Sequence, residues 1–250
     1  MIYFFIFLFG ICFGSFCNVL IHRTPKSLSI VSPRSKCPHC EAQLFWWHNI
    51  PLISFVLLRA KCHFCKEPIS SLYFLVELFI GVLFVYLFLL YGLSFSFVLL
   101  SVLFALLLSL CIIDIRYQAV PDSINISALS LAAVFAVINS KDFFYLTGLS
   151  DVLILVGVFY VLRFYVSFFL GQEAMGEGDI LIGGVMGGLL GVELALFAIF
   201  VSAFLALPFS MYARKKGQFA LPFIPFLVSA MSLVFFNQEF SQEVIHYATR

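Results

Sequence analysis

Two aspartates stand at the edges of long apolar runs. Asp114 follows the run from Ser94 to Ile113, and Asp179 precedes the run from Ile180 to Leu190. A carboxylate at the end of a membrane helix is costly, so its default interpretation is functional, with a partner to be found. Two carboxylates that share one proton supply both the acid and the base that peptide hydrolysis needs. Asp114 and Asp179 are therefore candidates for an acid/base pair.

A structural interpretation exists for some of these carboxylates. Asp122 and Asp179 each precede a predicted helix and can serve as N-caps. Asp114 is different, because the helix dipole disfavours a negative charge at a helix C-terminus. The residues alone leave catalysis and capping as equal alternatives. Gly176 and Gly178 precede Asp179, and we expect their missing side chains to let the backbone leave helical geometry and approach an extended substrate.

A second candidate site consists of two C-x-x-C pairs, separated by 21 residues. Four thiolates at this spacing are typical of a tetrahedral zinc site, with disulfides as the alternative. Four sulfur ligands leave no position open for a substrate, so we expect the zinc to be structural. The loop that contains these cysteines has roughly 50 residues, which is too few to form much of a hydrophobic core, so a bound metal ion is the usual way to stabilise it. The predicted ligands are Cys37, Cys40, Cys62 and Cys65.

The composition predicts that these sites belong to an all-α polytopic membrane protein. Of 250 residues, 63% are hydrophobic and 11% charged, whereas soluble domains carry about 25% charged residues. Several uncharged runs approach the roughly 20 residues that cross a bilayer as a helix. No basic block resembles a nucleic-acid-binding arm, so the lipid bilayer is an expected partner and nucleic acid is not.

The distribution of positive charge predicts the orientation. Half of the 14 Lys and Arg residues lie between the first two apolar runs, and short basic loops stay in the cytoplasm. The first run has no positive region before it, so we expect an uncleaved helix with its N-terminus outside. A cytoplasmic loop is also reducing, which favours zinc over disulfides.

Alternating the apolar runs from this starting point gives about eight spans. The run 180–191 is the shortest, at roughly 18 Å, and its glycines predict close packing against a neighbour. This topology puts Asp114 and the segment 171–179 at the cytoplasmic face, where the two aspartates can meet. It divides the chain into a first helix (1–22), a zinc-binding domain (23–71) and a membrane peptidase domain (72–250). The predicted spans are 2–21, 72–91, 95–113, 123–138, 146–170, 180–191, 192–213 and 219–236.

Several motifs together resemble the type IV prepilin peptidases, the GxGD-type aspartic proteases of the bacterial inner membrane. The matching segments are Gly14 to Arg23, Asn49 to Ser54, Pro68 to Ser70, Tyr73 to Glu77, Asp114 with Pro121-Asp122, Gly176 to Asp179, and the two cysteine pairs. Two positions depart from the family pattern: Leu181 stands where a lysine is frequent, and Ile224-Pro225 where Gly-Pro is common.

The resemblance implies a function and assigns roles. Asp114 and Asp179 would be catalytic, and the four cysteines would bind zinc. The substrates would be prepilins or pseudopilins, cut at the cytoplasmic face. Many family members then methylate the new N-terminal residue with S-adenosylmethionine. The chain has no glycine-rich loop after a strand, so the binding site for this cofactor stays unknown.

Three alternatives come from other interpretations of the same features. The first alternative is a peptidase without methyltransferase activity. Intramembrane carboxylates also relay protons in coupled transporters, but these have related halves, and no convincing internal repeat is present. A scaffold protein that binds partners through its zinc loop would leave the two aspartates unexplained. We therefore favour the bifunctional peptidase.

Overall fold

The computed structural model describes residues 1–32, 34–140, 146–171, 176–216 and 221–248. These residues are helical except for connecting loops and two isolated β-bridges. Six helices are long and apolar enough to cross a membrane, and α8 is a shorter apolar helix, so the predicted all-α membrane class is confirmed. The longer helices are α1 (Ile2–Arg23), α3 (Ser71–Tyr91), α4 (Phe95–Tyr117), α5 (Asp122–Asn139), α6 (Leu146–Leu170) and α7 (Glu177–Lys215); α8 (Ile224–Phe236) and α9 (Gln238–Ala248) follow.

The chain forms two compact units, Met1–Ala105 and Leu106–Arg250. In the first, α1 packs against α3 along a face with two small residues four positions apart. A Cβ atom on Gly10 would lie 2.9 Å from the Cα of Gly81, and one on Gly14 would lie 2.8 Å from the Cα of Glu77. Neither distance is tolerable for a real Cβ, so glycine permits this close approach, as in small-residue helix pairs generally.

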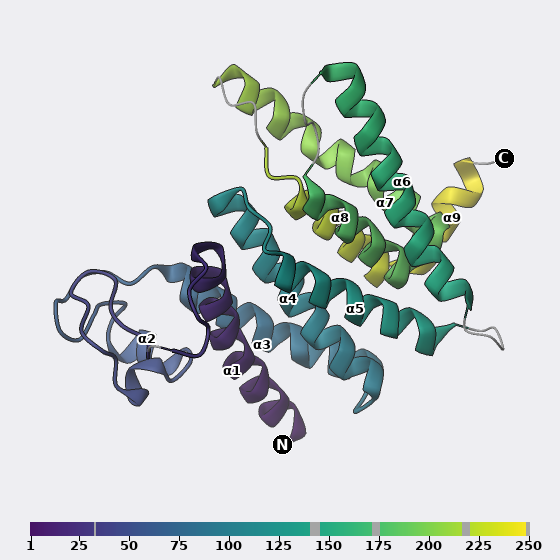
Figure 1. The fold of residues 1–250 in the computed structure, drawn as a ribbon. Coiled ribbons are helices and arrows are strands. Elements are labelled where there is room, and N and C mark those ends of the chain that lie inside the picture. Colours follow the sequence, from purple (N-terminus) through teal and green to yellow (C-terminus); the bar gives the residue numbers. More distant parts are fainter. Residues whose placement is uncertain (33, 141–145, 172–175, 217–220, 249–250) are drawn as a thin grey trace. The chain divides into compact units, whose positions relative to one another are not determined.

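The loop between α1 and α3 projects from one end of this helix pair (Figure 1). It contains three short helical elements: η1 (Thr24–Lys26), η2 (Trp46–Asn49) and α2 (Ile53–Leu57). One buried carboxylate ties it to the membrane helices, because the backbone N–H of Leu52 donates to Oε2 of Glu77 at 2.8 Å. Leu52 has a positive φ of 59°, which a leucine rarely adopts. Glu77 therefore fixes the loop at a strained position.

In the second unit, the first part of α7 packs against α5 and α6. A Cβ atom on Gly187 would meet the backbone of Asp151 in α6, and one on Gly188 would lie 2.8 Å from the carbonyl oxygen of Ala132 in α5. The predicted close packing of this glycine-rich run is thus confirmed. It matters for the site because it holds the start of α7 firmly against its neighbours.

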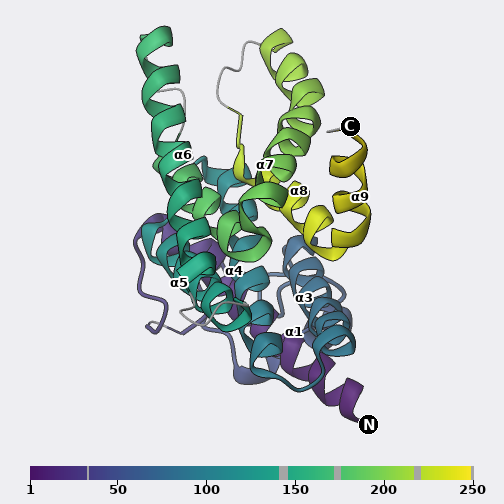
Figure 2. The ribbon, with the colours of Figure 1, turned by 90° about the vertical axis from the view of Figure 1, so that its right-hand side faces the viewer.

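Helix α7 combines two of the predicted spans. Its backbone is non-helical at Gly191, with φ 73° and ψ 170°, a conformation that favours glycine. From this bend the two parts of α7 run in different directions (Figures 1 and 2). The prediction of about eight spans counted 180–191 and 192–213 separately, whereas the described chain has six membrane-length helices and the shorter α8. The first part of α7 is too short to cross a bilayer of about 30 Å by itself.

Candidate active site and metal centre

Asp114 lies in the last turn of α4, with 7% of its surface exposed. The backbone N–H of Ile224, the first residue of α8, donates to its Oδ2 at 3.2 Å. The N–H groups at a helix start have no partner within the helix, so one of them is available to the carboxylate. The departure from the family pattern at Ile224 therefore leaves this contact intact, since a backbone group makes it.

Asp179 is the third residue of α7, and 8% of its surface is exposed. Its carboxylate lies close enough to Asp114 for the two to interact electrostatically. The end of α4 and the start of α7, 65 positions apart in the chain, thus bring the two predicted carboxylates together. Like charges that lie close together disfavour the state in which both are ionised, so one of two neighbouring carboxylates can keep a proton.

The backbone beside Asp179 is positioned by α5 and the loop before it. The side-chain amide of Asn125 donates to the carbonyl oxygen of Gly178 at 3.0 Å. A Cβ atom on Gly178 would lie 2.7 Å from three side-chain atoms of Val120. We expected Gly178 to leave helical geometry, but it is the second residue of α7. Its missing side chain makes room for Val120.

Two other acidic residues, Asp122 and Glu177, lie close in the sequence to the two aspartates. Asp122 was predicted as an N-cap, yet α5 begins at Asp122, Pro121 occupies the N-cap position and no side-chain cap bond forms. Glu177 pairs with Arg163 of α6 at 3.2 Å. Arg163 lies within an apolar helix, and this pair satisfies a charge that is otherwise costly there. Residues 172–175 of the predicted cytoplasmic segment lie outside the described residues.

The four predicted cysteines converge. Their sulfur atoms all lie within 4.8 Å of one another, and the sulfurs of Cys37 and Cys65 are 3.9 Å apart. Zinc–sulfur bonds of about 2.3 Å in tetrahedral geometry put sulfurs about 3.8 Å apart. The cysteine cluster, defined as Cys37, Cys40, Cys62 and Cys65, therefore fits a tetrahedral metal ion. Among the described residues it is the one group of His, Cys, Asp or Glu side chains with such an arrangement.

The two C-x-x-C segments fold in the same way. In the first, Cys37 N–H donates to Ala42 and Glu41 N–H donates to the carbonyl of Cys37. The second repeats both bonds at the equivalent positions, from Cys62 to Glu67 and from Lys66 to Cys62. Glu41 and Lys66, which follow the second cysteine of each pair, both have positive φ. Each segment is a tight knuckle that presents two sulfurs on one side.

Backbone hydrogen bonds in the second knuckle favour the thiolate form of Cys62 and Cys65. Hydrogen bonds from the backbone, first from Cys65, lower the pKa of Cys62 to about 7. The backbone N–H of Glu67 lowers the pKa of Cys65, but burial and hydrogen bonds to the other three thiols together raise it to about 12. Four crowded thiols thus compete for protons, and a metal ion that replaces those protons relieves the competition.

An aromatic cluster connects the second knuckle to η2. It consists of Phe45, Trp47, His48, His63 and Phe64. Phe45 stacks on Trp47 with ring centroids 4.7 Å apart, and His48 lies 5.0 Å from His63. Phe64 contacts Phe45 and His48 edge-on or tilted. Since His63 and Phe64 lie between Cys62 and Cys65, the knuckle holds η2 in place.

Comparisons with known proteins agree with this architecture. The profile of the Bacterial Peptidase A24 N-terminal domain matches residues 8–91, and that of the Type IV leader peptidase family matches residues 101–211. A prepilin leader peptidase/N-methyltransferase of Vibrio cholerae is 34% identical, over 95% of this chain and 98% of its own length. This chain belongs to the type IV prepilin leader peptidase/N-methyltransferase family.

Other members of the family are similarly close. A protein of the same name from Bacillus subtilis is 30% identical over 92% of both chains, and one from Myxococcus xanthus is 37% identical over 74% of this chain and 55% of its own. No solved structure matches. The cysteine cluster lies in the segment matched by the N-terminal domain profile, and Asp114 and Asp179 lie in the segment matched by the peptidase profile.

Three contributors to the site were not identified from the sequence: Asn125, Val120 and the N–H of Ile224. Asn125 carries a usable signal, because it is a polar residue on the first turn of an apolar helix and shares a face with residues that pack inward. The other two carry none. An aliphatic side chain and a backbone N–H acquire their roles only when distant segments meet.

Proposed function

We propose that this chain is a membrane aspartic endopeptidase that removes the leader peptide of type IV prepilins or pseudopilins, with Asp114 and Asp179 as its catalytic residues. One observation carries the assignment: two buried carboxylates from opposite parts of one unit interact at the Gly-x-Gly-Asp motif. Membership of the family supplies the reaction class. The contacts to Asp114 and to the carbonyl oxygen of Gly178 help to position the two carboxylates.

The pair supplies both proton transfers of hydrolysis. The ionised carboxylate takes a proton from water as the water oxygen attacks the scissile carbonyl carbon. The protonated carboxylate gives its proton to the carbonyl oxygen. When the carbon–nitrogen bond breaks, a proton passes to the leaving amine, and the pair again holds one proton. No metal takes part in these steps.

The cysteine cluster holds a structural zinc ion in this proposal. Its four sulfurs fill the coordination sphere, so the ion binds no substrate and supplies folding energy rather than chemistry. The cytosol is reducing, which keeps the thiols available. The cluster then fixes both knuckles and, through the aromatic cluster, the position of η2.

The positive charges support one orientation in the bacterial cytoplasmic membrane. The N-terminus is periplasmic, and the cysteine loop and the aspartate pair face the cytoplasm. A prepilin has a short basic leader before an apolar helix, and the same rule keeps that leader in the cytoplasm. We retain the division into 1–22, 23–71 and 72–250 as functional domains. The boundary of the compact units, within α4, is a separate property of packing.

We further propose that the chain methylates the new N-terminal amine with S-adenosylmethionine, as the names of its relatives imply for those proteins. One assay tests both activities. Purified protein in detergent is incubated with a prepilin peptide and S-adenosylmethionine, and the products are weighed by mass spectrometry. We expect loss of the leader and one added methyl group. An intact peptide would contradict the peptidase assignment, and a cleaved but unmethylated product would contradict only the second activity.

A further inference from the structure

Two glycine contacts and one ion pair fix the register between α6 and the first part of α7, which run antiparallel in the second unit. The pairs are Gly187 with Asp151, Gly183 with Phe159, and Glu177 with Arg163. This register puts Asp179 level with Val161. Helix α6 ends at Leu170, nine residues further along, which is roughly 14 Å at the usual helical rise. The aspartate pair therefore lies well inside the end of α6.

The second part of α7 gives an independent measure of the same depth. Phe209 packs against Phe226, with ring centroids 5.3 Å apart. Phe226 lies in the first turn of α8, where the N–H of Ile224 binds Asp114. Helix α7 continues from Phe209 to Lys215, six residues or roughly 9 Å beyond the level of the pair. Figures 1 and 2 show both α6 and the second part of α7 extending past the start of α8.

The helices that begin at the pair are too short to cross the bilayer. Gly191, at the bend of α7, follows Asp179 by twelve residues, and α8 has 13 residues. These lengths correspond to roughly 18–20 Å, whereas the hydrocarbon core is about 30 Å thick. The ionisable side chains of Asp151, Glu193 and His246 line a cavity at the bend, which places the bend at the opposite membrane surface. About 10 Å of the core then remains between the pair and the nearer surface.

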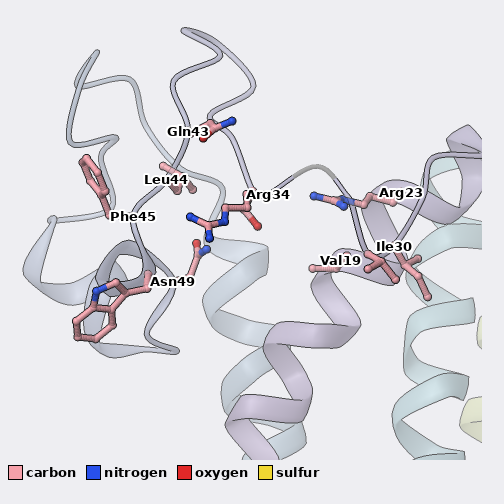
Figure 3. Close-up of a pocket in the computed structure, with 11 residues that line it drawn as sticks. Val19, Arg23, Ile30, Arg34, Gln43, Leu44, Phe45 and Asn49 are labelled. Carbon is pink, nitrogen blue, oxygen red and sulfur yellow. The ribbon is translucent and has the colours of Figure 1, made fainter.

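The first unit shows the usual arrangement for comparison. Its helix α1 has 22 residues, or roughly 33 Å, and can cross the whole core. Polar side chains gather around a cavity at the end of α1, and they include Arg23, Arg34, Gln43 and Asn49 (Figure 3). The polar groups of this unit therefore lie at the end of a full-length helix, unlike the aspartate pair of the second unit.

The helix segments beyond the level of the pair are apolar. On α6, no residue from 164 to 170 is charged, and Phe164, Phe168 and Phe169 are exposed. On α7, Met211 and Tyr212 are exposed as well. Exposing large apolar side chains to water costs free energy in proportion to their area, so acyl chains are the more favourable surroundings. These segments therefore belong in the hydrocarbon layer.

We propose that the aspartate pair works inside the bilayer, roughly 9–14 Å below the surface at which α6 and α7 end, and that the substrate is drawn in to reach it. The depth concerns this chain alone, whereas the entry of the substrate rests on the function proposed above. An extended chain advances about 3.3 Å per residue. About three or four residues of the leader then lie below the membrane surface, and the scissile bond meets the pair within the hydrocarbon layer.

Water reaches this depth along the side of α7 that carries Glu177. The Glu177 side chain is 82% exposed, and its Oε1 pairs with Arg163 at 3.2 Å. A charged side chain within a membrane faces water or the protein interior rather than acyl chains. Val161 lies at nearly the same level on α6 and is also exposed, but it is apolar and suits a lipid neighbour. One side of the site is thus open to water, which hydrolysis consumes, and another side to lipid.

Depth-dependent fluorescence quenching tests the position of the pair, since the chain has two tryptophans and both can be replaced. Single tryptophans are introduced into the full-length Trp46→Phe/Trp47→Phe protein in nanodiscs. They are Val161→Trp and Phe168→Trp in α6, and Phe79→Trp near the middle of α3 as a reference for a deep position. The lipids carry bromine either near the headgroup or near the middle of the acyl chain. We expect Val161→Trp and Phe79→Trp to lose more fluorescence to the deep bromines, and Phe168→Trp to the shallow ones.

The opposite order would overturn the proposal. If Val161→Trp responded mainly to the shallow bromines, the pair would lie at the membrane surface. If aqueous acrylamide quenched Phe168→Trp and brominated lipid did not, the end of α6 would stand outside the membrane. Glu177→Trp should be quenched by acrylamide although it lies nearly level with Val161→Trp, and its protection would exclude the water path. Tyr160→Trp, one residue from Val161 and also exposed, replaces Val161→Trp if that variant misfolds.

A tryptophan in the substrate tests the entry into the bilayer. A prepilin whose only tryptophan follows the scissile bond closely is placed in the same nanodiscs, alone or with the tryptophan-free enzyme that also carries Asp179→Asn. Alone, the shallow bromines should quench it most, because its basic leader stays outside the membrane. With the enzyme, we expect the stronger quenching to shift to the deep bromines. No shift would refute the entry of the substrate, even with a deep Val161→Trp. If the wild-type enzyme leaves prepilin uncut, the proposed function fails and the measured depth of the pair is unaffected.

Discussion

The side chain of Asn125 reaches from α5 to the carbonyl oxygen of Gly178, 3.0 Å away and one residue before Asp179. Asn125 is fully buried, and its Oδ1 has no hydrogen-bond partner among the described residues. A buried, unsatisfied acceptor costs free energy. The residue nevertheless spans two helices at the point where the second aspartate begins its helix. We interpret Asn125 as a positioning residue that sets the depth of Asp179 relative to Asp114.

We predict that Asn125→Ala lowers kcat for prepilin cleavage by about 10- to 100-fold, because a displacement near 1 Å is enough for such a loss. KM should change little, since Asn125 is fully buried. Steady-state kinetics on a fluorogenic prepilin peptide measure both. Asn139 at the other end of α5 bonds only to Phe135 of its own helix, so Asn139→Ala is the control. A normal kcat in Asn125→Ala would remove its positioning role.

The close packing of Gly178 and Val120 gives a prediction in which a second substitution, at Val120, should compensate for the first, at Gly178. Gly178→Ala would put a methyl group 2.7 Å from the Val120 side chain and displace the start of α7. We expect at least a tenfold loss of cleavage, by the same positional argument. Val120→Gly should restore much of the activity of Gly178→Ala, because it removes all three side-chain atoms that the new methyl group would meet.

Gly176→Ala is the matched control for this series. A Cβ atom there would lie 3.7 Å from Oδ2 of Asp179, an ordinary contact, so we expect a milder effect. The cleavage rates of the wild type, Gly178→Ala, the double variant at Gly178 and Val120, and Gly176→Ala are compared at equal amounts of inserted enzyme. This comparison tests whether Gly178 is required for packing. If Val120→Gly fails to rescue, Gly178 is required for a reason other than this packing, such as contact with the substrate backbone.

The helices and the cysteine cluster were predictable because their signals are local. Apolar runs set α3 and α6 almost to the residue, and the two C-x-x-C pairs identified all four sulfurs. Helix α4 continues past its apolar run to Tyr117, since backbone hydrogen bonds persist where hydropathy falls. The predicted last span began at 219, whereas α8 starts at Ile224, with Pro225 in its first turn, a favoured position for proline.

The two acidic residues of the candidate active site could be predicted from the sequence, but the groups that position them could not. The free-energy cost of placing a carboxylate at the end of a membrane helix singled out Asp114 and Asp179 in the sequence. The N–H of Ile224 lies 110 positions from Asp114, and no local pattern marks a backbone group for such a contact. The aromatic cluster is similar, because its histidines and phenylalanines resemble ordinary loop residues until η2 and the second knuckle meet.

The central prediction concerns the two aspartates. Asp114→Asn and Asp179→Asn preserve shape but leave a pair that cannot both donate and accept the proton. We expect each to lower cleavage by at least about 1,000-fold. Mass spectrometry of prepilin after timed incubation gives the rate, and size-exclusion profiles in detergent check folding.

Asp151 and Asp122 provide controls for the aspartate substitutions. Asp151 lies in α6 beside the bend of α7, away from the pair, so Asp151→Asn should cleave normally. Asp122→Asn should also be mild, because Asp122 makes no cap bond and only its favourable charge near a helix N-terminus is lost. Near-wild-type rates in either Asp114→Asn or Asp179→Asn would refute the two-aspartate mechanism. A complete loss in Asp122→Asn would mean that the first acid is misassigned.

The last prediction concerns the cysteine cluster and the position of η2. Cys62→Ser removes one of four sulfurs and, with it, much of the zinc affinity that orders the loop. The second knuckle carries His63 and Phe64, which hold η2 through the aromatic cluster. We therefore expect the variant to lose most of its zinc and to be cleaved by trypsin within the loop. The tryptophan fluorescence should also change, because Trp46 and Trp47 lie on η2, which loses its support. Elemental analysis, timed proteolysis and fluorescence measure these three effects.

Cys12→Ser and Cys111→Ser change cysteines within α1 and α4 and should leave all three unchanged. Full zinc content in a protein without the four clustered cysteines would refute the metal site. An unchanged tryptophan emission in a zinc-free Cys62→Ser protein would show instead that η2 keeps its position without the knuckle.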